Sequence, residues 1–216
     1  MFGLDFYDES ICALELFTQY ASSEFAIRAF ILKYEDKTMN QMLKWAKSSN
    51  FHIRRLSTEG CRPRLPWAVA LSNFKKDPSK VLEILELLKD DDSLYVRKSV
   101  ANNLNDISKD NPQLIINTIS SWKNRNKNCD WILKHGSRTL LKAGNKEVLN
   151  FFGFGEISHV QLKDFAISKE VNEGTSLLFN FTLSSIEPIG RVRVEYAIYF
   201  LKANNKLSKK VFMLSS

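Results

Sequence analysis

Up to about residue 155, the hydrophobic residues recur at the spacing of amphipathic α-helices. Residues 78–90 show this spacing clearly, and Pro78 stands where a helix would begin. Pro112 is placed to open a further helix after a break at residues 110–111. The pattern predicts a mainly α-helical fold for this part of the chain. The apolar face of residues 78–90 consists of Val81, Leu82, Ile84, Leu85 and Leu88.

A short motif that contains an arginine recurs in the second helix of each predicted helix pair. The last three arginines are separated by 43 and 41 residues, which fits the length of about 40 residues of HEAT and armadillo repeats. Such repeats stack into a solenoid whose second helices line a concave binding face. We predict a HEAT-like solenoid with a row of arginines on that face. In the alternative interpretation, the arginines form ion pairs between repeats. They are Arg28, Arg54, Arg97 and Arg138.

After residue 156 the hydrophobic pattern changes to the alternation that is typical of β-strands. It resembles part of a β-sandwich, although about 60 residues are too few for a complete one. We therefore predict two domains, a helical one over residues 1–155 and a partial β domain over residues 156–216. Strands are expected over residues 160–167, 176–183 and 191–200, and a fourth begins near Lys210.

Basic residues are concentrated in the helical part. The whole chain has a net charge of +7, whereas residues 44–142 contain 19 Lys and Arg against 10 Asp and Glu. Residues 123–146 contain seven basic residues and a single acid, Asp130. This distribution favours a polyanionic partner such as DNA, and a basic surface that only aids solubility is the alternative.

Several classes of protein are disfavoured by the composition. The three cysteines and three histidines show neither disulfide nor zinc-ligand spacing. No apolar run is long enough to span a membrane, and the acidic start does not resemble a signal peptide. Phosphate-binding glycine loops and the signatures of kinases, dehydrogenases and hydrolases are absent. We expect a reduced, cytoplasmic protein that needs no metal or other cofactor.

The predicted helix over residues 93–109 combines an apolar stripe with a polar one. The polar stripe puts Asp106 on the same face as Asn102 and Asn103. A solvated polar face is the simplest interpretation, but the helix begins with Arg97 and Lys98, which makes a binding face more plausible. The polar stripe consists of Ser99, Asn102, Asn103, Asp106 and Asp110.

Residues 59–67 are predicted to form a stiff, non-helical turn, because two prolines restrict the backbone. Arg62 and Arg64 on such a turn can bind phosphates with little loss of entropy. Trp67 can stack on a base or a cationic ring, or it can pack in the core. Glu59 can cap the turn or pair with an arginine. Glu24, which follows two serines, can be an N-terminal helix cap.

Four segments of the chain, from Ser23 to Gly144, carry a resemblance to a known family. Over about residues 10–155 the chain resembles the AlkC branch of the DNA alkylation repair glycosylases. The resemblance implies HEAT-like repeats that surround double-stranded DNA, followed by an immunoglobulin-like domain. It also implies hydrolysis of the N-glycosidic bond of alkylated bases, notably 3-methyladenine. Members of the branch extend beyond both ends of this chain, so we expect a truncated form. The segments are Ser23–Arg28, Arg55–Trp67, Val96–Lys109 and His135–Gly144.

By this resemblance, Asp106 corresponds to the catalytic aspartate, Glu24 to a second carboxylate at the lesion and Trp67 to an active-site aromatic residue. We expect a monomer that acts on DNA in the cytoplasm, at the nucleoid. The alternatives are a non-enzymatic HEAT scaffold for nucleic acid or an acidic protein, and an inactive remnant. Contacts with DNA are expected at Arg28, Arg54, Arg55, Arg62, Arg64, Arg97, Lys98, His135, Arg138 and Lys142.

Overall fold

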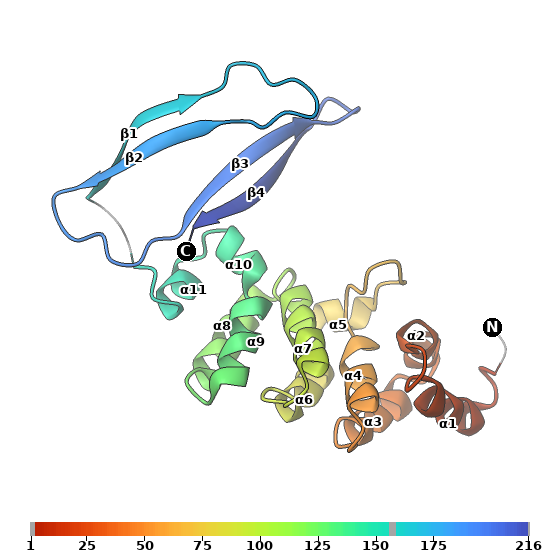
Figure 1. Ribbon diagram of the computed structural model, residues 1–216. Coiled ribbons are helices and arrows are strands. Elements are labelled where there is room, and N and C mark those ends of the chain that lie inside the picture. The colour runs from red at the N-terminus through yellow and green to blue at the C-terminus, as the bar shows by residue number, and fades with distance from the viewer. Residues whose placement is uncertain (1–2, 156–158, 216) are drawn as a thin grey trace. The chain divides into compact units, whose positions relative to one another are not determined.

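The computed structural model describes residues 3–155 and 159–215, which form two compact units, Met1–Val148 and Leu149–Ser216. The first unit is helical and the second contains the strands (Figure 1). The start of the predicted β domain, at residue 156, lies outside the described residues. Each unit is considered by itself below.

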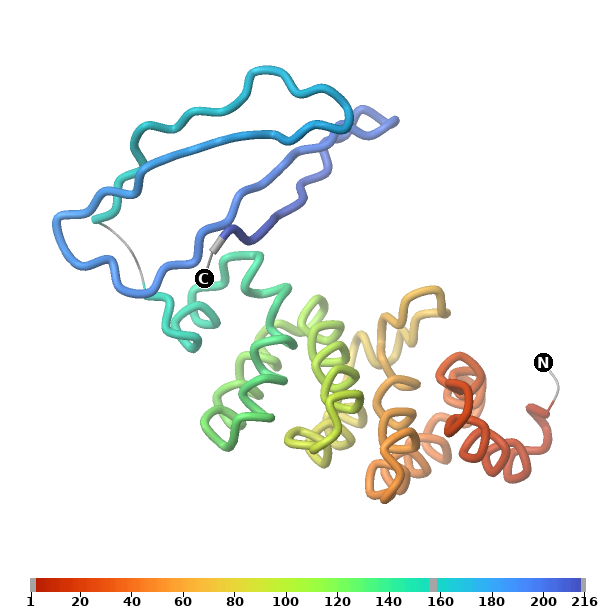
Figure 2. The backbone as a smooth tube through the Cα atoms, viewed as in Figure 1, coloured from red at the N-terminus to blue at the C-terminus, as the bar shows by residue number. Residues whose placement is uncertain are grey.

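The helices of the first unit stack as consecutive pairs (Figures 1 and 2). Within the pairs α3 contacts α4 and α8 contacts α9, while α4 contacts α7 and α7 contacts α9 between pairs. The second helices therefore lie side by side in a row, as a helical-repeat fold requires. The helices are α1 (Tyr7–Phe17), α2 (Glu24–Lys33), α3 (Glu35–Trp45), α4 (Phe51–Glu59), α5 (Ser72–Lys76), α6 (Ser79–Leu87), α7 (Leu94–Ile107), α8 (Pro112–Trp122), α9 (Lys127–Gly136), α10 (Arg138–Lys142) and α11 (Lys146–Phe151).

Local sequence accounts for where several helices begin. Pro112 is the first residue of α8, where its missing N–H is no loss. The side chain of Asn50 accepts a hydrogen bond from the N–H of His52 at the start of α4, and Asn126 caps α9 in the same way. The predicted apolar face of α6 is buried except for Leu82, which is partly exposed.

Helix α7 is central to the first unit, since it packs against α4 on one side and α9 on the other. Its apolar stripe is fully buried: Val96, Val100, Leu104 and Ile107 are at most 1% exposed. Gly136 allows α9 to come close, because a Cβ at this position would lie 2.9 Å from the Cβ of Leu104. Several polar residues of α7 are buried as well, among them Ser99, Asn103 and Asp106, whereas Lys98 is exposed.

The second unit contains two antiparallel hairpins. Strand β1 (Val160–Ile167) pairs with β2 (Phe179–Ser185), and β3 (Val194–Leu201) pairs with β4 (Leu207–Ser215). The hairpins meet through aromatic rings, since the ring centroids of Phe179 and Tyr196 are 5.2 Å apart. All four predicted strands are present, and β1 has the predicted bounds.

Candidate active site

Three carboxylates and two arginines form a continuous chain of ion pairs across three helix pairs. Glu24, at the start of α2, binds Nη1 of Arg55 on α4 at 2.6 Å. Arg55 also lies 3.6 Å from Glu59 at the end of α4. Arg62 then bridges Glu59, at 2.6 Å, and Asp106 of α7, at 2.8 Å. The structure thus links Glu24 and Asp106, two of the predicted site residues, through side-chain contacts.

Asp106 lies at the inner end of this network and is only 2% exposed. Its neighbours in the polar stripe of α7 are buried too: Ser99 donates to Oε2 of Glu59 at 2.6 Å, and Asn103 donates to the carbonyl oxygen of Thr58 at 2.8 Å. The stripe therefore faces α4. The interpretation of a solvated polar face is wrong for these three residues.

Glu59 belongs to the network, although the sequence left its role open between capping and pairing. Its carboxylate binds Arg62 and is close to Arg55, and its other oxygen accepts the hydrogen bond from Ser99. The spacing of the two arginines, four residues before and three residues after Glu59, could have indicated this arrangement. Glu59 is thus a candidate site residue that the sequence prediction did not include.

The network is balanced in charge, because three carboxylates face three cations. The third cation is Lys109, whose ammonium lies 3.0 Å from Oδ1 of Asp106. Burial acts to lower the pKa of Arg62, but the carboxylates of Glu59 and Asp106 outweigh this effect and raise the pKa. Arg62 therefore stays charged and holds both carboxylates in place. The Lys109 side chain is 39% exposed, so the network reaches the surface beside Asp106.

Trp67 is almost completely exposed, at 98%. It stands on the segment between α4 and α5, residues 60–71, which is called the 60–71 loop below. Its φ of 62° is in the left-handed region, which bulky residues rarely adopt. The alternative of core packing is therefore wrong. An exposed indole on a strained backbone is typical of a residue that is held ready for a ligand.

Four of the arginines predicted to bind DNA are engaged within the protein. Arg28 is 3% exposed and donates to main-chain carbonyl oxygens, which corrects the expected phosphate contact. Arg54 binds Asp91 of the next helix pair, as the ion-pair alternative predicted. Arg62 is held in the network, and Arg97 donates to the carbonyl oxygens of residues 91 and 92 and lies over Trp131. These contacts order the repeats, and the row of arginines is not a row of free cations.

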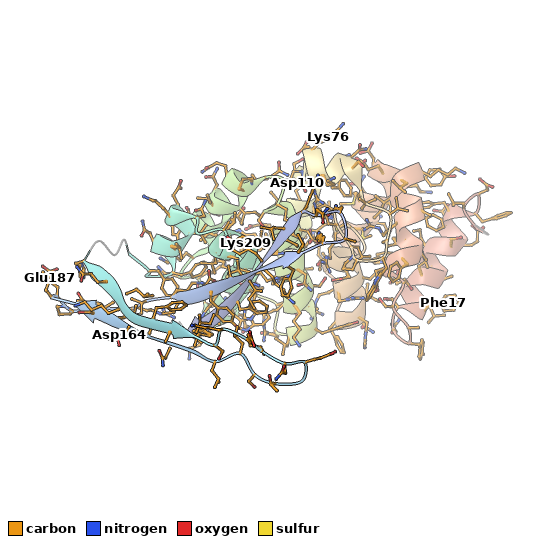
Figure 3. The ribbon with its side chains drawn as sticks, turned by 90° about the horizontal axis from the view of Figure 1, so that it is seen from above. Phe17, Lys76, Asp110, Asp164, Glu187 and Lys209 are labelled. Atoms are coloured by element: carbon orange, nitrogen blue, oxygen red, sulfur yellow. The ribbon has the colours of Figure 1, made fainter. Side chains whose placement is uncertain are left out.

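A fifth arginine, Arg55, is also engaged within the protein, since its side chain is 13% exposed and pairs with Glu24, whereas the remaining predicted DNA contacts are at or near the surface. Arg64 is partly exposed and forms a two-point ion pair with Asp110, which is labelled in Figure 3. Arg138 donates to the side chain of Asn102, one turn before Asp106 on α7. Arg55 lies in the network and against the ring of Tyr95. Lys98, His135 and Lys142 are exposed.

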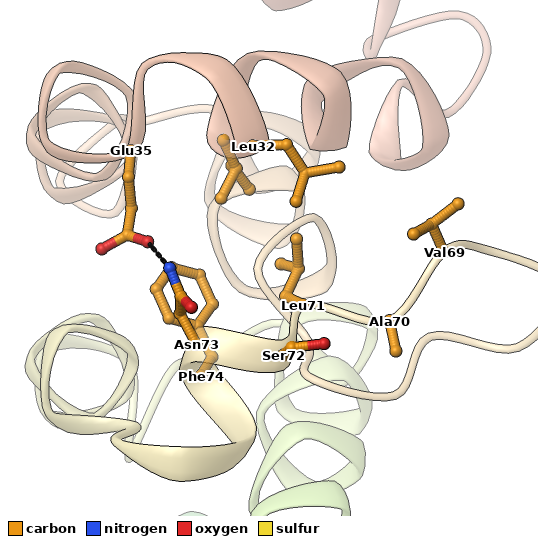
Figure 4. A pocket seen from close by; sticks show the side chains of 9 residues that line it. Leu32, Glu35, Val69, Ala70, Leu71, Ser72, Asn73 and Phe74 are labelled. Carbon is orange, nitrogen blue, oxygen red and sulfur yellow. Dashed lines mark hydrogen bonds between the residues drawn. The ribbon is translucent and has the colours of Figure 1, made fainter.

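Other kinds of site find little support in the part of the chain that the structure describes. Residues 3–155 and 159–215 contain no cluster of His, Cys, Asp and Glu that could hold a metal ion, and no described helix could cross a membrane. Burial raises the pKa of Cys61 to about 12, so its thiol is a poor nucleophile. A hollow beside the 60–71 loop is lined by residues 69–74 together with Ile31, Leu32 and Glu35, and it contains none of the three carboxylates (Figure 4).

A family model described as "DNA alkylation repair enzyme" matches residues 18–140, more than half of the chain. The chain belongs to this family. A second model, described as the C-terminal Ig-like domain of the uncharacterised protein YhaZ, matches residues 161–216. The second match confirms the predicted immunoglobulin-like β domain, and the stacked helix pairs confirm the predicted helical repeats.

A solved structure that is similar to this chain indicates the AlkC branch of the family, and an uncharacterised relative is similar over the same length. The structure of Pseudomonas fluorescens alkylpurine DNA glycosylase AlkC, bound to DNA that contains an abasic site analog, matches with a TM-score of 0.94 and 40% sequence identity. "Uncharacterized protein YhaZ" of Bacillus subtilis (strain 168) is 48% identical over 215 residues. Each match covers 99% of this chain but 60% of the other protein. The chain therefore spans about three fifths of the length of these relatives.

Proposed function

We propose that this chain is the catalytic and DNA-binding part of an alkylpurine DNA glycosylase, which hydrolyses the N-glycosidic bond of cationic bases such as 3-methyladenine in double-stranded DNA. The observation that carries the proposal is the buried network of Glu24, Glu59 and Asp106 next to the loop that presents Trp67. Membership of the family and the similarity to AlkC support it.

The chemistry of the lesion suits such a site. Alkylation at N3 of adenine makes the base a cation and hence a good leaving group, so a strong general acid is not needed. Departure of the base leaves positive charge on the sugar, as in glycoside hydrolysis. A carboxylate near C1′ stabilises that charge and can orient the attacking water. We assign this role to Asp106, and we assign to Glu24 and Glu59 assistance with the water or the charge.

The ion pairs of the network suit this role, because they hold the carboxylates in fixed orientations before DNA binds. Arg62 and Lys109 contact opposite oxygens of Asp106. Catalytic groups that are oriented beforehand need no reorganisation during the reaction. The exposed indole of Trp67 is available to contact the lesion or its sugar without a deep pocket for a flipped base. Arg64, Lys98, Arg138 and Lys142 are the proposed contacts with the DNA backbone.

The test is release of 3-methyladenine from methylated DNA by the purified chain and by its Asp106→Asn variant. We expect the single-turnover rate to fall by at least about 10²-fold, with the affinity for DNA changed by less than about threefold. Asp77→Asn is the control, because this exposed carboxylate only accepts a hydrogen bond at the start of α6.

An Asp106→Asn variant that releases the base as fast as the unmodified chain would contradict the assignment of Asp106. An unmodified chain that binds DNA without releasing any base would favour the alternative of a scaffold or an inactive remnant, as long as a full-length relative is active in the same assay.

A further inference from the structure

Arg28 is a buried cation whose hydrogen bonds go to main-chain carbonyl oxygens. Its Nε donates to Val69 at 3.0 Å, and its Nη1 donates to Gly60 at 3.0 Å and to Arg62 at 2.8 Å. Its Nη2 also donates to Val69. The residue is 3% exposed. A guanidinium in such a place loses its hydration, so these hydrogen bonds must compensate for a considerable cost.

The three carbonyl oxygens belong to the two ends of the 60–71 loop. Gly60 and Arg62 lie where the loop leaves α4, and Val69 lies where it approaches α5. Figure 4 shows Val69 on this segment, with Leu32 of α2 across the hollow. Within the loop, the N–H of Leu71 donates to Pro63 and that of Ala68 to Leu65. The Arg28 side chain, which belongs to α2, is therefore hydrogen-bonded to both ends of the loop.

The backbone is built to permit this contact. A Cβ on Gly60 would lie 2.5 Å from Cγ2 of Ile27, a distance that real Cβ atoms essentially never show. Glycine at this position thus lets the end of α4 approach α2 closely. The approach brings the carbonyl oxygen of Gly60 within reach of the Arg28 side chain.

Arg28 is linked to the candidate site through Arg62. Burial lowers the pKa of Arg28, Cys61 opposes this shift, the charge of Arg62 adds to it, and the carboxylates of Asp106 and Glu59 oppose it. Arg28 holds the main chain of Arg62, whose side chain contacts Glu59 and Asp106, so it is one residue removed from these carboxylates. Both Arg62, which contacts those carboxylates, and the strained Trp67 depend on the loop for their positions.

We propose that Arg28 is a positioning residue of the active site, which closes the 60–71 loop so that Arg62 faces Glu59 and Asp106 while Trp67 is presented to DNA. This inference rests on the proposed glycosylase function. It differs from the role expected from the sequence, because Arg28 does not contact the DNA backbone. Since a misplacement of about 1 Å can reduce a rate by about 10²-fold, loosening the loop should impair the reaction more than the binding of DNA.

The test compares Arg28→Lys with Arg54→Lys. A lysine retains the charge but cannot reach both ends of the loop with a planar fork of donors. Arg54 is the control, because its guanidinium also donates to carbonyl oxygens and links two helix pairs, yet its partners are residues 48, 49 and 91 and lie outside the loop. The measurements are the melting temperature, the affinity for methylated DNA, the single-turnover release of 3-methyladenine, and hydrogen exchange followed by mass spectrometry.

For Arg28→Lys we expect exchange in the 60–71 loop to accelerate by at least about tenfold, and base release to slow by about 10²-fold, with DNA affinity within about threefold. Arg54→Lys should lower the melting temperature while loop exchange and base release stay within about twofold. Equal losses of rate in the two variants, in proportion to their losses of stability, would overturn the proposal. Unchanged loop exchange in Arg28→Lys would overturn it as well.

Two further measurements keep the inference testable if Arg28→Lys does not fold. Arg28→Gln retains donors for one end of the loop and removes the charge. Its base release should therefore also slow while its affinity for DNA stays nearly unchanged. In the unmodified chain, the amides of Ala68 and Leu71 should exchange as slowly as those of α2, and fast exchange there would refute the proposed closure of the loop by Arg28. Hydrogen exchange does not depend on activity. If the unmodified chain releases no base while a full-length relative does, the proposed function fails, but the exchange of the loop amides still decides whether Arg28 closes the loop.

Discussion

Replacing Arg62 with methionine tests whether the buried network depends on this one cation. The side chains of Arg62, Glu59 and Asp106 are 8%, 7% and 2% exposed. Removing one partner of a buried ion pair leaves an uncompensated charge and typically costs about 3–5 kcal/mol. Here Glu59 keeps Ser99 and Arg55, and Asp106 keeps Lys109. We therefore expect the low end of that range, about 3 kcal/mol.

The assay is denaturant unfolding followed by far-ultraviolet circular dichroism, with Arg64→Met as the control. Arg64 also forms a two-point ion pair, but its side chain is 38% exposed and that of Asp110 is 21% exposed. Solvent screens such a pair, so its loss should cost less than about 1 kcal/mol. A loss for Arg62→Met that is no larger than that for Arg64→Met would refute the reasoning.

The same two variants distinguish structural arginines from those that contact DNA. Arg62 is paired inside the protein, so its removal should leave the salt dependence of DNA affinity unchanged. Arg64 is at the surface, and its removal should lower that dependence by about one counterion. The sequence predicted a phosphate contact at both positions, whereas burial separates them.

Two further predictions concern the surface. Trp67 is exposed and its backbone is left-handed. In Trp67→Gly, relief of about 1–2 kcal/mol of left-handed strain is partly offset by about 0.5–1 kcal/mol of glycine entropy, so the free energy of unfolding should rise by up to about 1 kcal/mol while base release slows. A loss of stability above about 1 kcal/mol would show that the indole packs on the protein. The hydrogen bond from Arg64 lowers the pKa of Asp110, against the opposing effect of burial, so the native state binds fewer protons than the unfolded state at this group. The stability difference between the unmodified chain and Asp110→Asn, at most about 1 kcal/mol, should therefore persist from pH 7 down to about pH 4 and vanish as the pH falls further. A difference that did not decrease at all between pH 4 and pH 2 would contradict this account.

The fold was predictable because it depends on local patterns. Helical spacing, the prolines at the starts of α6 and α8, and the alternation after residue 156 all act within a few residues along the chain. The bounds of the strands were less accurate where turns compete with pairing: β2 begins at Phe179 instead of residue 176, and β3 at Val194 instead of residue 191. Register between strands is set by partners that are distant in sequence.

The sequence by itself determined the helical repeats, the change to strands and the residues Glu24, Trp67 and Asp106 as candidates for the site. Only the tertiary structure decided how charged residues divide between the interior and the surface. Arg28 and Arg64 were both predicted to contact DNA, yet one is buried against carbonyl oxygens and the other lies at the surface with Asp110. The physical reason is that a buried guanidinium must exchange its hydrogen bonds with water for hydrogen bonds with protein groups. Those groups come from segments far away in the sequence, so the sequence around an arginine does not determine whether it is buried or exposed.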